Sequence, residues 1–234
     1  MKILAIDTSS NICSVSILED TNIIIEKHND DQKTHSQKLM PLIEDTFTEA
    51  NLQLDNIDMI ACCQGPGSFT GIRIGISTVK AFADVKNIPI IGVTSLESLA
   101  YNIKNNGLIA SIIDAKNDNV YFALLQLENN SYNTICAPIS DNINNIISYL
   151  KQYSEPITFV GDGACVHKNL LNTEFENCIF ASDNENVQTS ISVGLAAFSK
   201  FNSSDYIPEY SVSPIYLKKS QAEINLENKL NSKN

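Results

Sequence analysis

The stretch Met59–Gly75, MIACCQGPGSFTGIRIG, decides the fold. Its first five residues are apolar and predict a short buried strand. A helix is predicted directly after the glycines, because apolar residues recur at spacings of three and four in Ile72, Ile76, Val79 and Ala83. Glycines at such a turn let the backbone approach a ligand or another segment, and a helix N-terminus favours an anion. The candidate residues of this glycine-rich motif are Gly65, Pro66, Gly67, Ser68, Phe69, Thr70, Gly71, Arg73 and Gly75.

Two well-known motifs are excluded here. No Gly-Lys-Ser/Thr follows, so the motif is not a Walker loop, and Pro66 stands where a nucleophile elbow around Ser68 needs glycine. Gly71 and Gly75 are four residues apart, so they share a helix face that is bare enough for close contact with another helix. A tight turn without any ligand is the alternative interpretation.

The chain begins with a predicted antiparallel meander. The apolar run Lys2–Ile6 ends at Asp7, Cys13–Leu18 alternates serine with apolar residues, and Ile23–Ile25 gives a third strand. The first turn carries Asp7, Thr8, Ser9 and Ser10, whose carboxylate and hydroxyls can orient a hydrated metal ion and phosphate oxygens. The alternative is a capped turn in which these side chains satisfy backbone N–H groups.

Helices and strands then alternate, which is typical of a layered α/β domain. Leu39, Ile43 and Phe47 predict a helix that starts near Thr34–Ser36, with Pro41 in its first turns. A strand at Ile88–Val93 and a short helix at Ser95–Asn102 follow.

A second unit repeats the element order after Asn105-Asn106-Gly107, which predicts a boundary. We therefore predict a first lobe at residues 1–104, a second lobe at 105–217 whose last helix packs back on the first, and a polar disordered tail at 218–234. The second lobe is expected to contain strands at Leu108–Asp114, Val120–Leu127 and Ile157–Val160, a third weak strand, a helix at Ile143–Leu150 and a late helix around Val193.

Composition excludes several classes of protein. The net charge of −11 argues against binding of nucleic acid by this chain alone, while 43% apolar and 18% charged residues fit a globular protein. No run approaches the roughly 20 apolar residues that span a bilayer, and Asp7 interrupts the apolar start too early for a signal peptide. The six cysteines contain no C-x-x-C pair, which favours reduced, mostly buried thiols over a zinc site or a disulfide scaffold. These observations predict a cytoplasmic protein without membrane contact.

Five strings together resemble the TsaB (YeaZ) family. They are Ile6-Asp7-Thr8-Ser9, Thr34-His35-Ser36, the glycine-rich motif, Asp114-Ala115-Lys116 before Val120-Tyr121, and Gly161-Asp162-Gly163. The matches run in the family's order from about residue 3 to residue 164, and the glycine-rich motif is highly specific.

The resemblance implies an α/β fold of two actin-like (ASKHA, RNase H-like) lobes, each a mixed sheet flanked by helices. It also implies a role in forming threonylcarbamoyladenosine in transfer RNA, beside the anticodon. In that role the family binds its paralogue TsaD, the metal-bearing transferase, and with it the ATPase TsaE. The transfer RNA is expected to be contacted only through the complex, and the chain alone is expected to form a homodimer.

One departure predicts a pseudo-enzyme without metal or catalytic residues. TsaD carries H-x-x-x-H after the strand that follows the glycine-rich helix, and Ser95 and Leu99 stand there in this chain. No cofactor is expected to bind tightly, although a nucleotide at the TsaD interface, held by Asp7 to Ser10, stays open. The partner interface is predicted on the helices that begin near His35 and Thr70, with these side chains shared between core and partner: His35, Leu39, Leu42, Ile72, Ile76 and Val79.

Two enzymatic alternatives are kept. One is an ATP-dependent enzyme of the same superfamily, and the other is a peptidase that acts on TsaD through His35 with Ser36 or Ser68. Neither has an identifiable complete set of catalytic groups.

Overall fold

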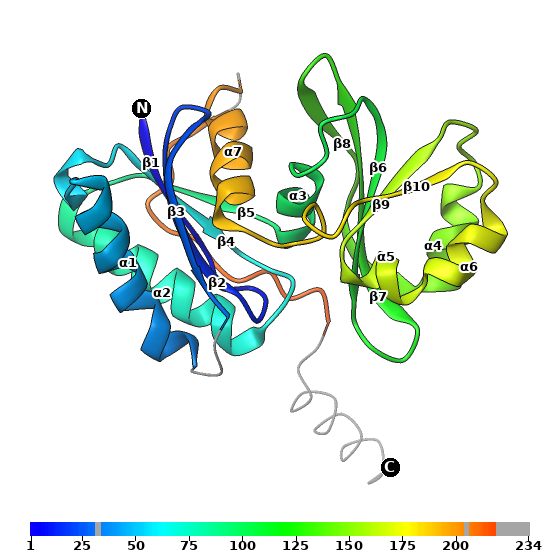
Figure 1. Ribbon diagram of the computed structural model, residues 1–234, viewed down its shortest axis with the longest axis horizontal. Coiled ribbons are helices and arrows are strands. Elements are labelled where there is room, and N and C mark those ends of the chain that lie inside the picture. The colour runs from blue at the N-terminus through cyan, green and yellow to red at the C-terminus, as the bar shows by residue number, and fades with distance from the viewer. Residues whose placement is uncertain (31–33, 204–205, 219–234) are drawn as a thin grey trace, which may run out of the picture.

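The computed structural model describes residues 1–30, 34–203 and 206–218, and it shows two five-stranded sheets side by side (Figure 1). The first sheet has the order β3-β2-β1-β4-β5. Its strands are β1 (Lys2–Asp7), β2 (Cys13–Glu19), β3 (Asn22–Asn29), β4 (Met59–Cys63) and β5 (Ile90–Val93). β1, β2 and β3 pair antiparallel, whereas β4 pairs parallel to both β1 and β5. The predicted meander and the buried strand before the glycine-rich motif are confirmed.

The second sheet repeats this order as β10-β9-β6-β7-β8. Its strands are β6 (Gly107–Asp114), β7 (Asn119–Glu128), β8 (Ser131–Asn142), β9 (Ile157–Val160) and β10 (Cys178–Phe180). The strand expected to be weak is β8, which is long but has no buried residue and pairs with two register shifts, so its apolar alternation is faint. Sequence analysis missed β10 because three residues carry no periodic signal.

The helices cover the first sheet on both faces. α1 (His35–Ala50) and α2 (Phe69–Lys86) pack on one face, and α7 (Ser190–Phe201) packs on the other (Figure 1). The short 3-10 helix η1 (Leu54–Asn56) follows α1. Thr34 is the N-cap of α1, and Pro41 lies in its second turn.

One helix from each half crosses to the other. α3 (Ser95–Ala100) comes from the first half, but Leu96 and Leu99 pack in one core cluster with Ile109 and Ala123 of the second sheet. Conversely, Val193 of α7 packs with Ala5 of β1. The second lobe is completed by α4 (Ile143–Leu150), α5 (Asp162–Val166) and α6 (Lys168–Glu174). Each lobe thus depends on a helix from the other half of the chain.

The last described segment, residues 206–218, returns to the first lobe. Glu209 forms an isolated antiparallel bridge with Ile90 at the open edge of β5. Of the predicted tail, residues 219–234 lie outside the described residues. Across the described part of the chain, no helix has the length and apolar character needed to cross a membrane.

Candidate functional site

The glycine-rich motif wraps the turn between β1 and β2. The N–H of Ser68 donates to the carbonyl oxygen of Ser9 at 2.7 Å. A Cβ on Gly67 would overlap that same oxygen, so only glycine allows the two backbones to lie so close. Two candidate segments far apart in the sequence therefore form one site.

The bare face of α2 packs against Thr8 and, at Gly71, also against His35 at the start of α1. Thr8 Oγ1 donates to the carbonyl oxygen of Gly71 at 2.8 Å. A Cβ on Gly71 would overlap the Thr8 carbonyl oxygen and the His35 ring, and one on Gly75 would overlap Thr8 Oγ1. The expectation of close helix–helix contact therefore holds at Gly71, which meets the first residue of α1, whereas at Gly75 the turn after β1 occupies the surface.

Asp7 is buried at the centre of this turn. Its Oδ1 accepts hydrogen bonds from the N–H of Ser9 at 2.7 Å and from Ser9 Oγ at 2.6 Å. Its Oδ2 is buried and accepts no hydrogen bond from the residues that the structure describes. Burial raises the pKa of the Asp7 carboxyl above its ordinary value, while the bonds from Ser9 oppose the rise. The hydroxyls of Thr8 and Ser9, which a phosphate or a hydrated metal ion would use, are thus engaged by the Gly71 carbonyl oxygen of α2 and by Asp7.

Replacing Asp7 by asparagine is expected to stabilise the fold at neutral pH. A raised carboxyl pKa means that the folded state holds its proton more tightly, so this group lowers stability as pH rises above the ordinary value of 3.8. The Asp7→Asn variant removes that loss. Its urea midpoint should exceed that of the native chain at pH 7, and the difference should shrink as pH falls toward 4. A lower midpoint at pH 7 would contradict the burial argument.

His35 is tied to the same turn. Its Nε2 lies 2.7 Å from the carbonyl oxygen of Ser10, and because a carbonyl only accepts, Nε2 carries the proton. Ser68 Oγ accepts the N–H of Gly71 at 3.2 Å as the N-cap of α2. His35 therefore joins the start of α1 to the turn, and its Nε2 is not oriented as a base toward Ser36 or Ser68.

An open pocket of about 630 Å³ lies where α1 and α2 begin. It is lined by Ser10, Asn11, Asp30, Thr34, His35, Ser36, Lys38, Ser68, Thr70, Gly71 and Ile74. Ser10 reaches it from the turn, and Ser68, Thr70 and Gly71 reach it from the glycine-rich motif.

The apolar interface candidates lie in the chain's own core. Leu39, Leu42, Ile72, Ile76 and Val79 are all buried in one cluster beneath α1 and α2. Their assignment to a partner surface is corrected, since their side chains already pack on the first sheet.

The two positions where the resemblance to TsaD predicts histidine ligands, Ser95 and Leu99, do not fit a metal. Ser95 Oγ lies 3.1 Å from the Sγ of Cys63, and Leu99 is buried between the lobes. Within the described ranges, no three His, Cys, Asp or Glu side chains come close enough to hold an ion. A neutral hydroxyl and an apolar side chain stand where two imidazole ligands for iron or zinc would be needed.

The cysteines are free thiols of mixed exposure. Cys13, Cys62 and Cys63 are buried, whereas Cys165 is exposed. Burial raises the pKa of Cys13 to about 11 and raises that of Cys63 further. Three of the six thiols are buried, two are partly buried and one is exposed, so the expectation of mostly buried thiols is met for only half of them.

Two lobes with the same strand order, the first of which carries a glycine-rich turn between a strand and a helix, define an actin-like fold. The ROK hexokinase of Thermus thermophilus shares this fold, with a TM-score of 0.50 at 8% identity over 85% of this chain and 98% of that chain. YeaZ from Pseudomonas aeruginosa matches more closely, with a TM-score of 0.77 at 24% identity over 92% of this chain and 99% of that one.

Sequence comparison gives the family. The family model described as "TsaD: tRNA N6-adenosine threonylcarbamoyltransferase" matches residues 23–226. The Bacillus subtilis tRNA threonylcarbamoyladenosine biosynthesis protein TsaB is 33% identical over 172 residues, which are 73% of this chain and 75% of that protein. The chain belongs to the TsaB (YeaZ) family.

Proposed function

We propose that this chain is a non-catalytic subunit that binds and activates the TsaD transferase, together with TsaE, in the formation of threonylcarbamoyladenosine beside the anticodon of transfer RNA. Membership of the TsaB family supports involvement in this biosynthesis. The net charge of −11 supports contact with the RNA through a partner rather than directly.

The proposal of a non-catalytic role rests on the residues found at the start of α3. The chain keeps the fold of a family whose model describes a transferase, yet Ser95 and Leu99, where the resemblance to TsaD leads us to expect two histidine ligands, serve packing. The turn at Asp7 adds to this argument, because Thr8 and Ser9 direct their hydroxyls to protein groups. A chain that keeps the fold of a transferase but lacks the metal ligands suits a structural subunit that binds the related transferase and stabilises its active conformation.

The proposed partner surface is the outer face of α1 and α2, which lie side by side on one side of the first lobe (Figure 1). Met40 is 51% exposed on α1, and Ser77 is exposed on α2. The same surface is proposed to pair two copies of the chain when TsaD is absent.

Reconstitution tests the proposal. Purified TsaD and TsaE are assayed for modification of transfer RNA with and without this chain. Modification is expected to fall to background without it. Equal modification in both reactions would overturn the activating role.

The rival function is an ATP-dependent enzyme, which the orphaned and buried Oδ2 of Asp7 keeps open. Steady-state ATP turnover by the purified chain, lost in an Asp7→Ala variant, would favour this rival. The peptidase alternative has less support, because His35 Nε2 faces a carbonyl oxygen.

A further inference from the structure

The segment Tyr206–Lys218, here called the strap, is bound along the first lobe by backbone contacts. The N–H of Ile90 donates to the Glu209 carbonyl oxygen at 2.7 Å, and the N–H of Ile215 donates to the Gln64 carbonyl oxygen at 2.9 Å. Gln64 Nε2 donates to the Ser213 carbonyl oxygen at 2.9 Å. Val212 is buried in the core beneath α1 and α2. The strap therefore covers the end of β4, directly before the glycine-rich motif.

An aromatic latch, formed by Phe69, Arg73 and Tyr216, fixes the strap to the start of α2. The rings of Phe69 and Tyr216 stack with centroids 4.7 Å apart. Arg73 lies over the Phe69 ring at 3.8 Å and donates from Nε to Tyr216 Oη at 2.7 Å. All three contacts lie at the surface, since Phe69 is 41% and Tyr216 is 44% exposed.

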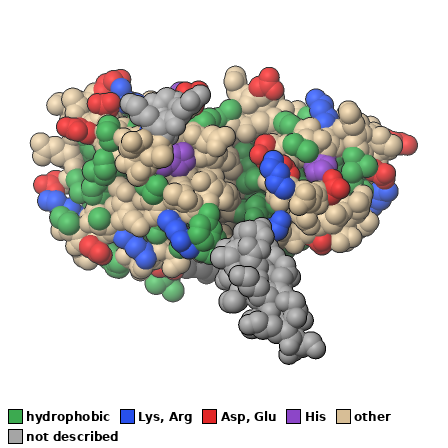
Figure 2. Space-filling model, turned by 90° about the horizontal axis from the view of Figure 1, so that it is seen from below, with side chains coloured by type: hydrophobic (Ala, Val, Ile, Leu, Met, Phe, Trp, Pro, Cys, Tyr) green, Lys and Arg blue, Asp and Glu red, His purple; other side chains and the backbone are tan. Residues whose placement is uncertain are grey.

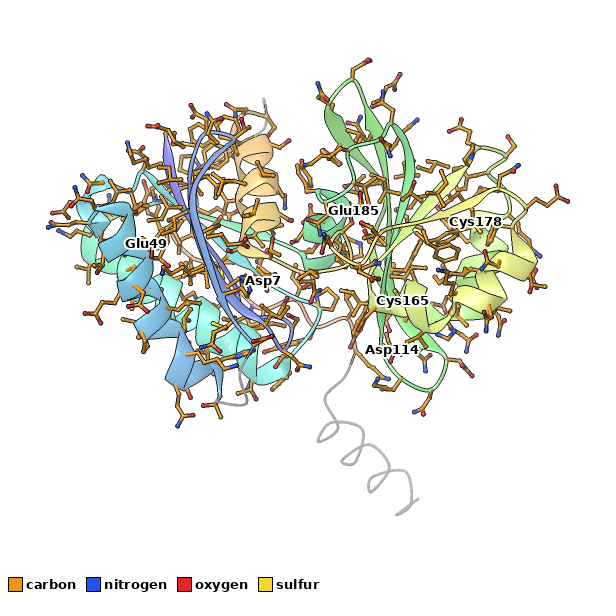
Figure 3. All side chains as sticks on the ribbon, viewed as in Figure 1. Asp7, Glu49, Asp114, Cys165, Cys178 and Glu185 are labelled. Carbon is orange, nitrogen blue, oxygen red and sulfur yellow. The ribbon has the colours of Figure 1, made fainter. Side chains whose placement is uncertain are left out.

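The next residues belong to the second lobe. Leu217 packs against the cluster that contains Ile113 and Val160, and Lys218 Nζ donates to the Ala115 carbonyl oxygen at 3.2 Å. The strap thus passes from one lobe to the other between Tyr216 and Leu217. In Figure 1 its orange-red trace runs along the first lobe to the gap between the lobes. Figure 2 shows hydrophobic side chains on both sides of this junction, and Figure 3 labels Asp7 and Asp114, which lie across it from one another.

The strap also has the features of a segment that can detach. Ile207 is 76% and Tyr210 is 47% exposed, and the strap's one described pairing with a sheet is a single bridge. Val212 is the one buried side chain among the strap residues, and segments with so few buried apolar contacts open at low free energy while the core stays folded. The latch has only surface contacts to hold it, so a group that binds Phe69 and Arg73 competes directly with Tyr216.

We propose that the strap is a releasable brace that fixes the angle between the two lobes, and that the Phe69–Arg73–Tyr216 latch keeps it closed. Opening the latch frees Leu217 and Lys218 from the second lobe, and the lobes then sample a wider range of angles. A group that binds at the start of α2 can therefore change the junction between the lobes. This inference is independent of the proposed function, because it concerns the isolated chain.

The test compares two tyrosine variants of the full chain. Tyr216→Ala removes the latch, whereas Tyr210→Ala removes an equally exposed tyrosine of the strap outside it. Azide-bearing amino acids at the exposed positions Val85 and Val166, one in each lobe, carry a dye pair for single-molecule energy transfer. Hydrogen exchange of the Ile215 amide reports whether the strap has opened.

Tyr216→Ala is expected to widen the inter-lobe distance distribution and to speed exchange of the Ile215 amide about tenfold, because the variant removes the ring stacking with Phe69 and the cation–π interaction with Arg73. Tyr210→Ala is expected to leave both unchanged. Leu217→Ser provides a second variant, which should widen the distribution while the latch stays formed. Identical distributions for Tyr216→Ala and Tyr210→Ala, or a native distribution for Leu217→Ser, would overturn the proposal.

Discussion

Capture of TsaD by this chain is expected to weaken about 30-fold when Met40 is replaced by glutamate, the loss that corresponds to one hot-spot side chain of about 2 kcal/mol. Met40 lies on the outer face of α1 and is 51% exposed, so the chain's own core does not depend on it. A carboxylate there would be buried without a partner once the helices dock, and an unpaired buried charge is costly. Affinity is measured by titration of TsaD against the immobilised chain.

A matched control comes from the second lobe. Val166 is 62% exposed, and Val166→Glu introduces the same charge far from α1 and α2. This variant should bind TsaD normally, support modification of transfer RNA and form the proposed homodimer when sedimentation is measured, whereas Met40→Glu should weaken all three. Equal capture by the two variants would place the interface elsewhere, while the reconstitution experiment would still test activation.

The periodic elements could be predicted from the sequence, but their partners could not. Spacings of three and four identify the apolar faces of α1 and α2, and alternation identifies β1 and β2. Periodicity shows which face is buried, yet it does not show what buries it. The pattern therefore allowed Leu39 and Ile72 to be assigned to a partner, although the first sheet covers them.

Individual contacts within the candidate site could not be predicted from the sequence either. The glycine-rich motif is visible in the sequence because its glycines and its following helix are local. Its contact with Thr8 joins residues 63 positions apart, and that of Arg73 with Tyr216 joins residues 143 positions apart. No pattern around Tyr216 marks it, since it lies in a segment without regular alternation. Such contacts follow from the fold and not from local spacing.

Replacing Gly71 by alanine is expected to lower the free energy of unfolding by about 2 kcal/mol. A Cβ at this position would overlap the Thr8 carbonyl oxygen and the His35 ring, and a backbone oxygen cannot turn away as a flexible side chain can. Such overpacking costs about 3 kcal/mol, while the better helix propensity of alanine returns about 1 kcal/mol. Urea denaturation followed by circular dichroism measures the difference.

Ser77→Ala on the same helix separates the steric cost of an added Cβ from the change in helix propensity. Ser77 is exposed, so this change tests propensity without any close contact and should stay within about 0.5 kcal/mol of the native chain. If Gly71→Ala were instead stabilising, the close approach of α2 to the turn after β1 would be absent in solution. The hydrogen bond from Thr8 to the Gly71 carbonyl oxygen would then lose its geometric basis. A destabilised Gly71→Ala variant beside a neutral Ser77→Ala variant would instead establish that glycine is needed here for contact with the Asp7–Ser10 turn.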